Sequence, residues 1–248
     1  MCGIDCGIGA QLGREHMFEL TKNSFDAAVF GCGGNPLAQA NEYAHLNRAY
    51  SQVHRAYHTK QHLAECLAHL RIADAEMPES AGSAQQIAEI ALALWYHDAV
   101  YRPQRDDNET RSARWFRFRA QQFGIASSCI QRLSAMILAT RHGIAVAPEG
   151  AQTQLLLDID LAILAATPAR FREYCEQIRV EYAFVPDAIF AQKRAQVLRE
   201  FLTPKKIYNS YVGARFEVAA RLNLTNEIVR LVSLRQKAKH TKLKSSLF

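Results

Sequence analysis

Histidines and aspartates in separate segments of the sequence could together hold a metal ion. Four histidines lie between residues 54 and 69, and His58 and His62 have the four-residue spacing that puts two imidazoles on one helical face. The pair His97-Asp98 ends a segment that is otherwise apolar, AEIALALWYHDAVY. Burying a carboxylate and an imidazole without partners is costly, so a divalent cation is a partner that this pair could require.

A further segment, QLLLDIDLAILAA, places Asp158 and Asp160 inside an apolar helical pattern. Imidazoles and carboxylates form a nitrogen and oxygen ligand set that suits one divalent ion, which could be Mn²⁺, Fe²⁺, Ni²⁺, Zn²⁺, Co²⁺ or Mg²⁺. Such an ion lowers the pKa of bound water from about 15.7 towards about 7 and so prepares it for hydrolysis. A structural zinc site is the alternative, but such sites favour thiolates.

The elements that must position these residues are helices, because apolar residues recur at helical intervals along nearly the whole chain. No long alternating run of β-branched residues appears, so we predict an all-α fold. The predicted helices cover residues 18–30, 37–50, 62–73, 87–97, 110–123, 126–141, 152–166, 168–183, 187–201 and 213–234.

Length and charge favour one globular domain. The chain has 248 residues, 49% of them hydrophobic, which is enough for an ordinary core. We place the domain at residues 17–234, after a flexible extension (1–16) and before a basic tail (235–248). Six of the 30 Lys and Arg residues follow Glu227, the last acidic residue, so the preceding residues carry 24 charges of each sign. A neutral body disfavours a nucleic-acid track outside the tail.

Cysteine usage and hydropathy indicate the compartment. The six cysteines are scattered, and no signal-peptide pattern opens the chain, so we predict a reducing cytoplasm. No apolar run approaches the roughly 20 residues that a membrane-spanning helix needs. We therefore expect no membrane span.

The order of His62, then His97-Asp98, then an Asp in a later helix resembles the H…HD…D metal signature of the HD-domain superfamily of phosphohydrolases. The resemblance covers about residues 17–234 and is greatest to a group of bacterial proteins described as predicted metal-dependent HD phosphohydrolases. It implies an HD-domain helical bundle with additional C-terminal helices. The matching segments are HRAYHTKQH, WYHDAVY, DNETRSA, LDIDLAIL and IRVEY.

The resemblance also implies roles for the site residues. The segment YHTKQH resembles the Tyr-His-Asn-x-x-His of cyclic-nucleotide phosphodiesterases, which implies that His62 binds the metal and His58 donates a proton to the leaving oxygen. His97 and Asp98 complete the HD pair, and Asp98 is also expected to act in catalysis. Superfamily members commonly show a small residue, then Asp, then Leu. This pattern favours Asp160 as the last ligand over Asp158, which would then orient a ligand imidazole.

Other polar residues could support the ligands or hold a phosphate. Arg102 is the first choice because it follows Asp98 by four residues. Asn108 and Glu109 have a second interpretation as a helix N-cap, and each cation has one as a solvated surface charge. The candidates for these roles are Arg55, Arg102, Asn108, Glu109, Arg141 and His142, with Lys193 and Arg194 as further cations.

The predicted function is hydrolysis of a phosphoester by metal-activated water, with a small phosphorylated molecule such as a nucleotide as substrate. A mononuclear site is favoured, because dinuclear relatives usually carry more than one added histidine and His142 is the main candidate. The alternatives are a catalytically silent module that binds a ligand or a partner, and a di-iron oxygenase on the same scaffold. Nucleic acid bound through the basic tail is a further, less favoured, partner.

Overall fold

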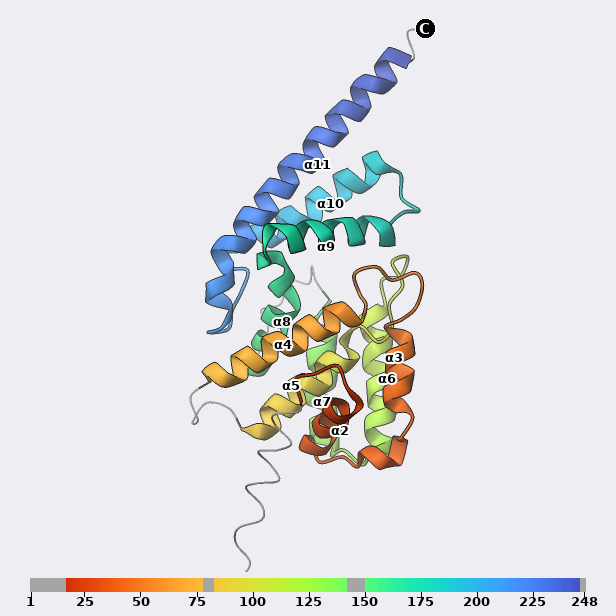
Figure 1. Ribbon diagram of the computed structural model, residues 1–248, viewed down its shortest axis with the longest axis vertical. Helices are drawn as coiled ribbons and strands as arrows, with labels where there is room; N and C mark the ends of the chain where they lie inside the picture. The colour runs from red at the N-terminus through yellow and green to blue at the C-terminus, as the bar shows by residue number, and fades with distance from the viewer. Residues whose placement is uncertain (1–16, 78–82, 142–149, 246–248) are drawn as a thin grey trace, which may run out of the picture. The chain divides into compact units, whose positions relative to one another are not determined.

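The computed structural model describes residues 17–77, 83–141 and 150–245, with side chains through residue 234 (Figure 1). Regular structure within these ranges is entirely helical, which confirms the all-α prediction. The chain divides into two compact units, Met1–Asp160 and Leu161–Phe248, so the single domain predicted over 17–234 draws on both. The predicted extension, 1–16, lies outside the described residues.

The first unit is a set of helices around one central helix. Its described elements are α2 (Lys22–Gly31), the 3-10 helix η1 (Pro36–Gln39), α3 (Glu42–Ala49), α4 (Lys60–Glu76), α5 (Ala84–His97), α6 (Asn108–Gln122), α7 (Ser127–Ala139) and α8 (Ala151–Asp160). Helix α5 is central because it contacts α2, α4, α6, α7 and α8.

Helix α5 is buried because most of its side chains are apolar, and its buried Glu89 pairs with Arg132. All of its residues from Ile87 to His97 are buried. Its start is fixed by a capping box in which Ser83 and Gln86 satisfy each other's backbone N–H groups. The helix ends at His97, and Asp98 is its C-cap residue. The His-Asp pair therefore lies at the C-terminal end of this buried helix.

Several element boundaries differ from the predictions. The helix predicted over 37–50 is η1 followed by α3, and the helix predicted over 152–166 is α8 followed by the 3-10 helix η2 (Leu161–Ala165). The last helix, α11 (Glu217–Ser245), continues well beyond residue 234 into the predicted tail. Residues that favour helix without a strong stop signal explain this longer course, since the tail contains neither Gly nor Pro.

The second unit contains η2, α9 (Pro168–Glu181), α10 (Asp187–Leu202), the 3-10 helix η3 (Gly213–Phe216) and α11. Helix α11 packs along α10 (Figure 1). Asn223 on α11 donates through Nδ2 to the carbonyl oxygens of Leu164 and Ala166, both at 2.9 Å, which fixes the η2 segment to this helix.

The second unit also holds a cavity of about 580 Å³ between α9 and α11, with Phe171, Cys175, Asn223 and Arg230 in its wall. None of the residues that line it belongs to the predicted metal site. Across the described ranges, no helix is both long and apolar enough to cross a bilayer.

Candidate metal centre

Four of the predicted ligands meet within the first unit. His62 comes from α4, His97 and Asp98 from the end of α5, and Asp160 from the last residue of α8. The Nε2 atoms of the two histidines are 3.2 Å apart. Asp160 Oδ1 lies 3.1 Å from His62 Nε2 and 3.5 Å from His97 Nε2. Asp98 Oδ2 lies 3.2 Å from His97 Nε2 and 3.6 Å from His62 Nε2.

These separations fit neighbouring ligands of one divalent ion. Nitrogen and oxygen ligands bind Zn²⁺ at about 2.0–2.2 Å, so two ligands at a right or tetrahedral angle lie about 3–3.6 Å apart. Donor atoms of His62, His97 and Asp98 all lie within 4.8 Å of one another. The side chains are also buried, with exposed fractions of 3% for His62 and 1% for His97. The residues present therefore fit a metal ion.

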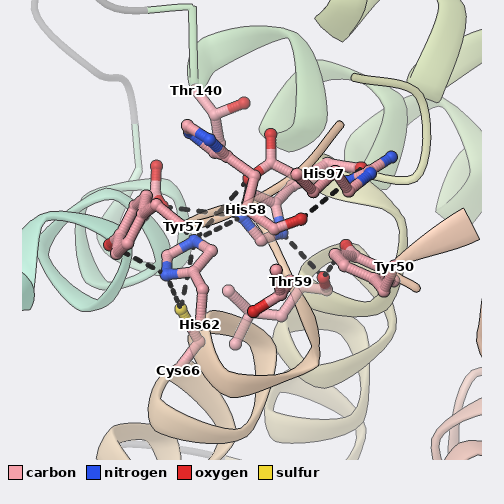
Figure 2. Close-up of polar contacts among 12 residues, drawn as sticks. Tyr50, Tyr57, His58, Thr59, His62, Cys66, His97 and Thr140 are labelled. Atoms are coloured by element: carbon pink, nitrogen blue, oxygen red, sulfur yellow. Dashed lines mark hydrogen bonds and ion pairs between the residues drawn. The ribbon is translucent and has the colours of Figure 1, made fainter. Parts of the chain in front are cut away.

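The second nitrogen of each imidazole has its own partner. His97 Nδ1–H donates to the carbonyl oxygen of Leu94 at 2.7 Å, so the lone pair of neutral His97 is on Nε2 and faces the centre. His62 Nδ1 lies 3.0 Å from the hydroxyl of Tyr57 (Figure 2). Such partners fix the tautomer and orientation of metal-binding histidines. Leu94 and Tyr57 can therefore orient the two imidazoles, while the orienting role of Asp158 stays a prediction.

The electrostatics of the centre favour a bound cation. Burial alone would raise the pKa of Asp98, but the neighbouring rings of His97, His58 and His62 hold it well below its usual range. Burial alone would lower the pKa of His97, yet the carboxylates of Asp98 and Asp160 raise it well above its usual value. The carboxylates thus draw positive charge to the His97 ring, as they would draw it to an ion.

Asp160, rather than Asp158, reaches the two imidazoles. Both side chains are buried, with exposed fractions of 9% and 2%. Residues two apart on a helix point to different faces, so only one of the two can face His62. Among the described residues, Asp160 belongs to a group of converging metal donors and Asp158 does not. The preference for Asp160 agrees with this geometry.

His58 is beside the centre but is not on the helix of His62. Helix α4 begins at Lys60 with Thr59 as its N-cap, whose side chain accepts from the N–H of Gln61. The prediction of a shared helical face is therefore wrong, because the cap places His58 in the preceding loop. The ring of His58 stacks on Tyr101 at 3.9 Å and lies 6.1 Å from the His62 ring, centroid to centroid.

Arg55 ties the loop before α4 to the turn after α5. Its guanidinium is buried and donates to the carbonyl oxygens of His58 at 2.9 Å, Asp98 at 2.8 Å and Ala99 at 3.1 Å. It also lies over the ring of Tyr101, 5.5 Å from the centroid. Arg55 therefore supports the segments that carry site residues, which was one of its two predicted roles, the other being contact with substrate.

Arg102 and Asn108 belong to the loop that follows the His-Asp pair. The amide of Asn108 accepts from the N–H of Arg102 and donates to its carbonyl oxygen, both at 3.0 Å. Asn108 thus holds the loop and is not an N-cap; Asp107 occupies the cap position without a side-chain cap bond. Glu109 lies in the first turn of α6. Arg102 is exposed, and its Nη1 donates to Nδ1 of His54 at 3.2 Å.

The last two candidates lie beyond α7. Arg141 is exposed directly after that helix, and its backbone N–H donates to the carbonyl oxygen of Leu138. Its predicted contact with a phosphate stays a prediction. His142 lies outside the described residues.

Sequence reasoning missed two residues of the centre, Tyr57 and Cys66. The Tyr57 hydroxyl and Cys66 Sγ both reach the His62 ring, Cys66 at 3.7 Å from Nδ1 and 3.8 Å from Nε2 (Figure 2). Burial, followed by the charges of Asp160, Asp98 and Glu65, raises the pKa of the Cys66 thiol. The four-residue spacing from His62 to Cys66 was a signal for the cysteine. Tyr57 had a signal too, because it is the first residue of the segment YHTKQH, but no role was assigned to it.

Comparison with protein-family models, curated proteins and solved structures found no significant match to this chain. The case for a functional site therefore rests on the arrangement of its own residues. Membership of the HD-domain superfamily stays a prediction.

Proposed function

We propose that the first unit is a metal-dependent phosphohydrolase that cleaves a phosphoester with water. One observation carries the proposal: two imidazole nitrogens and two carboxylate oxygens from distant segments converge with separations of 3.1–3.6 Å. His62, His97, Asp98 and Asp160 would hold the ion. When bound there, a divalent ion would lower the pKa of water and offset the negative charge of a phosphoryl group.

The protein's own groups keep the ligands ready. The carbonyl oxygen of Leu94 accepts a hydrogen bond from Nδ1 of His97, which leaves the Nε2 lone pair of the neutral ring facing the carboxylates. The Tyr57 hydroxyl, 3.0 Å from Nδ1 of His62, would accept from that nitrogen when Nε2 of His62 binds an ion. Arg55 holds the backbone at Asp98 against the loop of His58. These contacts preserve the geometry of the ligands before substrate arrives, and preorganisation of this kind is what an efficient site requires.

His58 is the proposed proton donor to the leaving oxygen. It lies close enough for its charge to lower the pKa of Asp98, and its ring stacks on the ring of Tyr101. An imidazole can transfer a proton near neutral pH because its ordinary pKa is about 6.5. A ring nitrogen of His58 would give its proton to the departing alkoxide as the phosphorus–oxygen bond breaks.

Arg102 is the proposed contact for the phosphate of the substrate. His54 donates from Nε2 to the carbonyl oxygen of Tyr101 at 2.8 Å, so its Nδ1 accepts the Arg102 guanidinium. This pair sets the direction of an exposed cation on the loop next to Asp98. A guanidinium recognises phosphate oxygens because its N–H groups form a planar fork. Small phosphorylated molecules such as nucleotides are therefore the proposed substrates. The proposed compartment is the cytoplasm.

The test is a measurement of metal content and phosphoesterase activity on the purified full-length protein. Mono-, di- and cyclic nucleotides would be screened with each candidate metal, using Asp160→Asn as the site variant and Asp107→Asn as the control. Asp107 is an exposed partner of Arg111 outside the centre. We expect one ion per chain and phosphate release that Asp160→Asn abolishes and Asp107→Asn preserves.

Two results would overturn the proposal in different ways. Metal binding with no hydrolysis of any phosphoester would favour the silent binding module. Two iron ions per chain, with oxygen consumption in place of phosphate release, would favour the oxygenase.

A further inference from the structure

Cys66 lies one helical turn after His62, on the same buried face of α4. Its exposed fraction is 2%, and its Sγ is 3.7–3.8 Å from both ring nitrogens of His62. Donor atoms of His62, Cys66 and Asp160 all lie within 4.8 Å of one another. The centre therefore contains two overlapping sets of three donors, one with His97 and Asp98 and one with Cys66 and Asp160, and His62 is common to both.

We propose that Cys66 is a fifth donor of this centre and gives it a thiolate ligand for Zn²⁺, Co²⁺ or Cd²⁺. The inference rests on the proposed function only for the location of the metal, and it adds the class of ion that the site prefers. Thiolate ligands select soft ions such as Zn²⁺, whereas carboxylate ligands also suit harder ions such as Mn²⁺.

The surroundings of Cys66 distinguish it from an ordinary buried cysteine. Cys32, Cys129 and Cys175 are also buried and free. Cys129 donates to Glu89, which in turn pairs with Arg132. Within the described ranges, Cys66 is the one cysteine that shares a group of three converging donors with a histidine and an aspartate.

The local structure explains how Cys66 comes to this position. A four-residue spacing places His62 and Cys66 on one face of α4, and α8 packs against that helix. Asp160, the last residue of α8, thereby lies near both side chains.

Binding changes the protonation of the sulfur in a defined way. The thiol of Cys66 loses its proton to the solvent, and the sulfur lone pair forms the bond to the ion, so no electron is gained or lost. No oxidant or reductant is required.

The experiment uses Co²⁺ as the probe with the full-length, metal-stripped protein under reducing conditions. Visible ligand-field absorption reports that cobalt is in the site, and near-ultraviolet charge-transfer absorption reports a sulfur–cobalt bond. Cys66→Ser is the test variant. Cys129→Ser is the matched control, a buried cysteine of the same unit outside the centre.

We expect both absorptions in the native protein and in Cys129→Ser. In Cys66→Ser the charge-transfer band should disappear while one cobalt stays bound. The Zn²⁺ affinity of this variant should fall by at least about tenfold, with Mn²⁺ affinity unchanged, because only the soft ion depends on sulfur.

Each other outcome is decisive. Visible bands without charge transfer in the native protein would overturn the thiolate ligand and leave the metal site intact, whether or not Cys66→Ser folds. A charge-transfer band that survives in a folded Cys66→Ser protein would place the thiolate elsewhere. Failure to bind cobalt at all would overturn this inference and the metal centre together, whereas bound cobalt without phosphoesterase activity would overturn only the proposed reaction.

Discussion

Two buried carboxylate clusters in the first unit show how a structural acid differs from a functional one. Glu42 has a fully buried side chain, and its Oε1 accepts from the hydroxyl of Tyr96 at 3.0 Å and from Nε1 of Trp115 at 2.7 Å. The guanidinium of Arg119 lies 2.9 Å from its Oε2. Fixed donors and a permanent positive charge thus satisfy this carboxylate within the folded chain.

Asp98 and Asp160 have different neighbours. Both face the Nε2 atoms of His62 and His97, at 3.1–3.6 Å. The His97 ring already donates its Nδ1 proton to Leu94, so in its neutral form it offers the carboxylates a lone pair and no proton. Electron pairs that converge in a buried space repel each other unless a proton or a metal ion lies between them. Of the two clusters, only this one is built to receive a cation.

The largest expected effect is loss of the metal on removal of one of these carboxylates. Asp98→Ala should abolish stoichiometric metal binding, because it leaves one carboxylate to offset the charge of a divalent ion. Glu42→Gln, which changes a carboxylate of the structural cluster, should leave metal content unchanged. Metal analysis of both variants, with circular dichroism to check helical content, measures the contrast. Equal metal content in native protein and in folded Asp98→Ala would contradict the distinction between the Glu42 cluster and the cluster of Asp98 and Asp160.

The fold class and the cluster of histidines and aspartates that could hold a metal ion were predictable because their sequence signals are local. Apolar periodicity defined the helices, and the all-apolar stretch before His97 indicated that the His-Asp pair is buried. The aspartates at 158 and 160 stood out because charged residues are rare in such a run. Those features depend on a residue and its immediate neighbours in sequence.

Contacts between distant segments could not be predicted in the same way. Arg55 donates to the carbonyl oxygens of Asp98 and Ala99, more than 40 residues later, and a carbonyl leaves no mark on the sequence. The position of His58 depended on where α4 begins. Thr59 is a favourable N-cap residue, so that boundary did have a sequence signal, but the histidine spacing outweighed it.

The next effect separates binding from catalysis within the metal centre. His58→Ala should retain its metal and lose about 10²–10⁴-fold in kcat, the range for general acid catalysis. The ring of His58 is stacked on Tyr101 and lies outside the four converging donors, which is why the metal should remain. Steady-state kinetics and metal analysis on the same preparation provide the measurement. Joint loss of metal and activity would make His58 a ligand.

The structural cluster should show its effect in stability. Glu42→Ala leaves the Arg119 charge and the Tyr96 and Trp115 donors without their shared acceptor. Breaking a buried pair in this way costs about 3–5 kcal/mol, measured as the free energy of unfolding in denaturant. The matching change at the centre, Asp160→Asn in metal-free protein, should cost much less, because it removes one of two neighbouring negative charges. A larger loss of unfolding free energy in Asp160→Asn than in Glu42→Ala would mean that the carboxylates of the centre, and not Glu42, stabilise the fold.

A smaller effect concerns the orientation of His62. Tyr57→Phe removes the hydroxyl that lies 3.0 Å from Nδ1 while keeping the buried ring. Loss of such a partner typically lowers metal affinity by about 10–100-fold. Competition with a chelator of known affinity measures the change, and Tyr50→Phe is a control because its hydroxyl bonds the α5 backbone and not an imidazole. Equal affinity in Tyr57→Phe and native protein would show that packing alone orients His62.

The smallest effect should come from the basic end of α11, which tests whether attraction for substrate resides in the centre. Removal of residues 235–248 deletes five Lys and Arg residues, and the remainder, with 25 basic and 24 acidic residues, keeps the metal ligands and Arg102. For a small phosphoester, kcat/KM should change by less than about threefold, because the metal ligands and Arg102 that would hold it are retained. A polynucleotide substrate would behave differently: each lost phosphate contact would reduce the salt dependence of binding by roughly one unit of slope. Kinetics on a nucleotide and salt titrations with single-stranded RNA, on both lengths of chain, distinguish the two cases. A steep salt slope that disappears with the tail would move substrate recognition from the metal centre to α11.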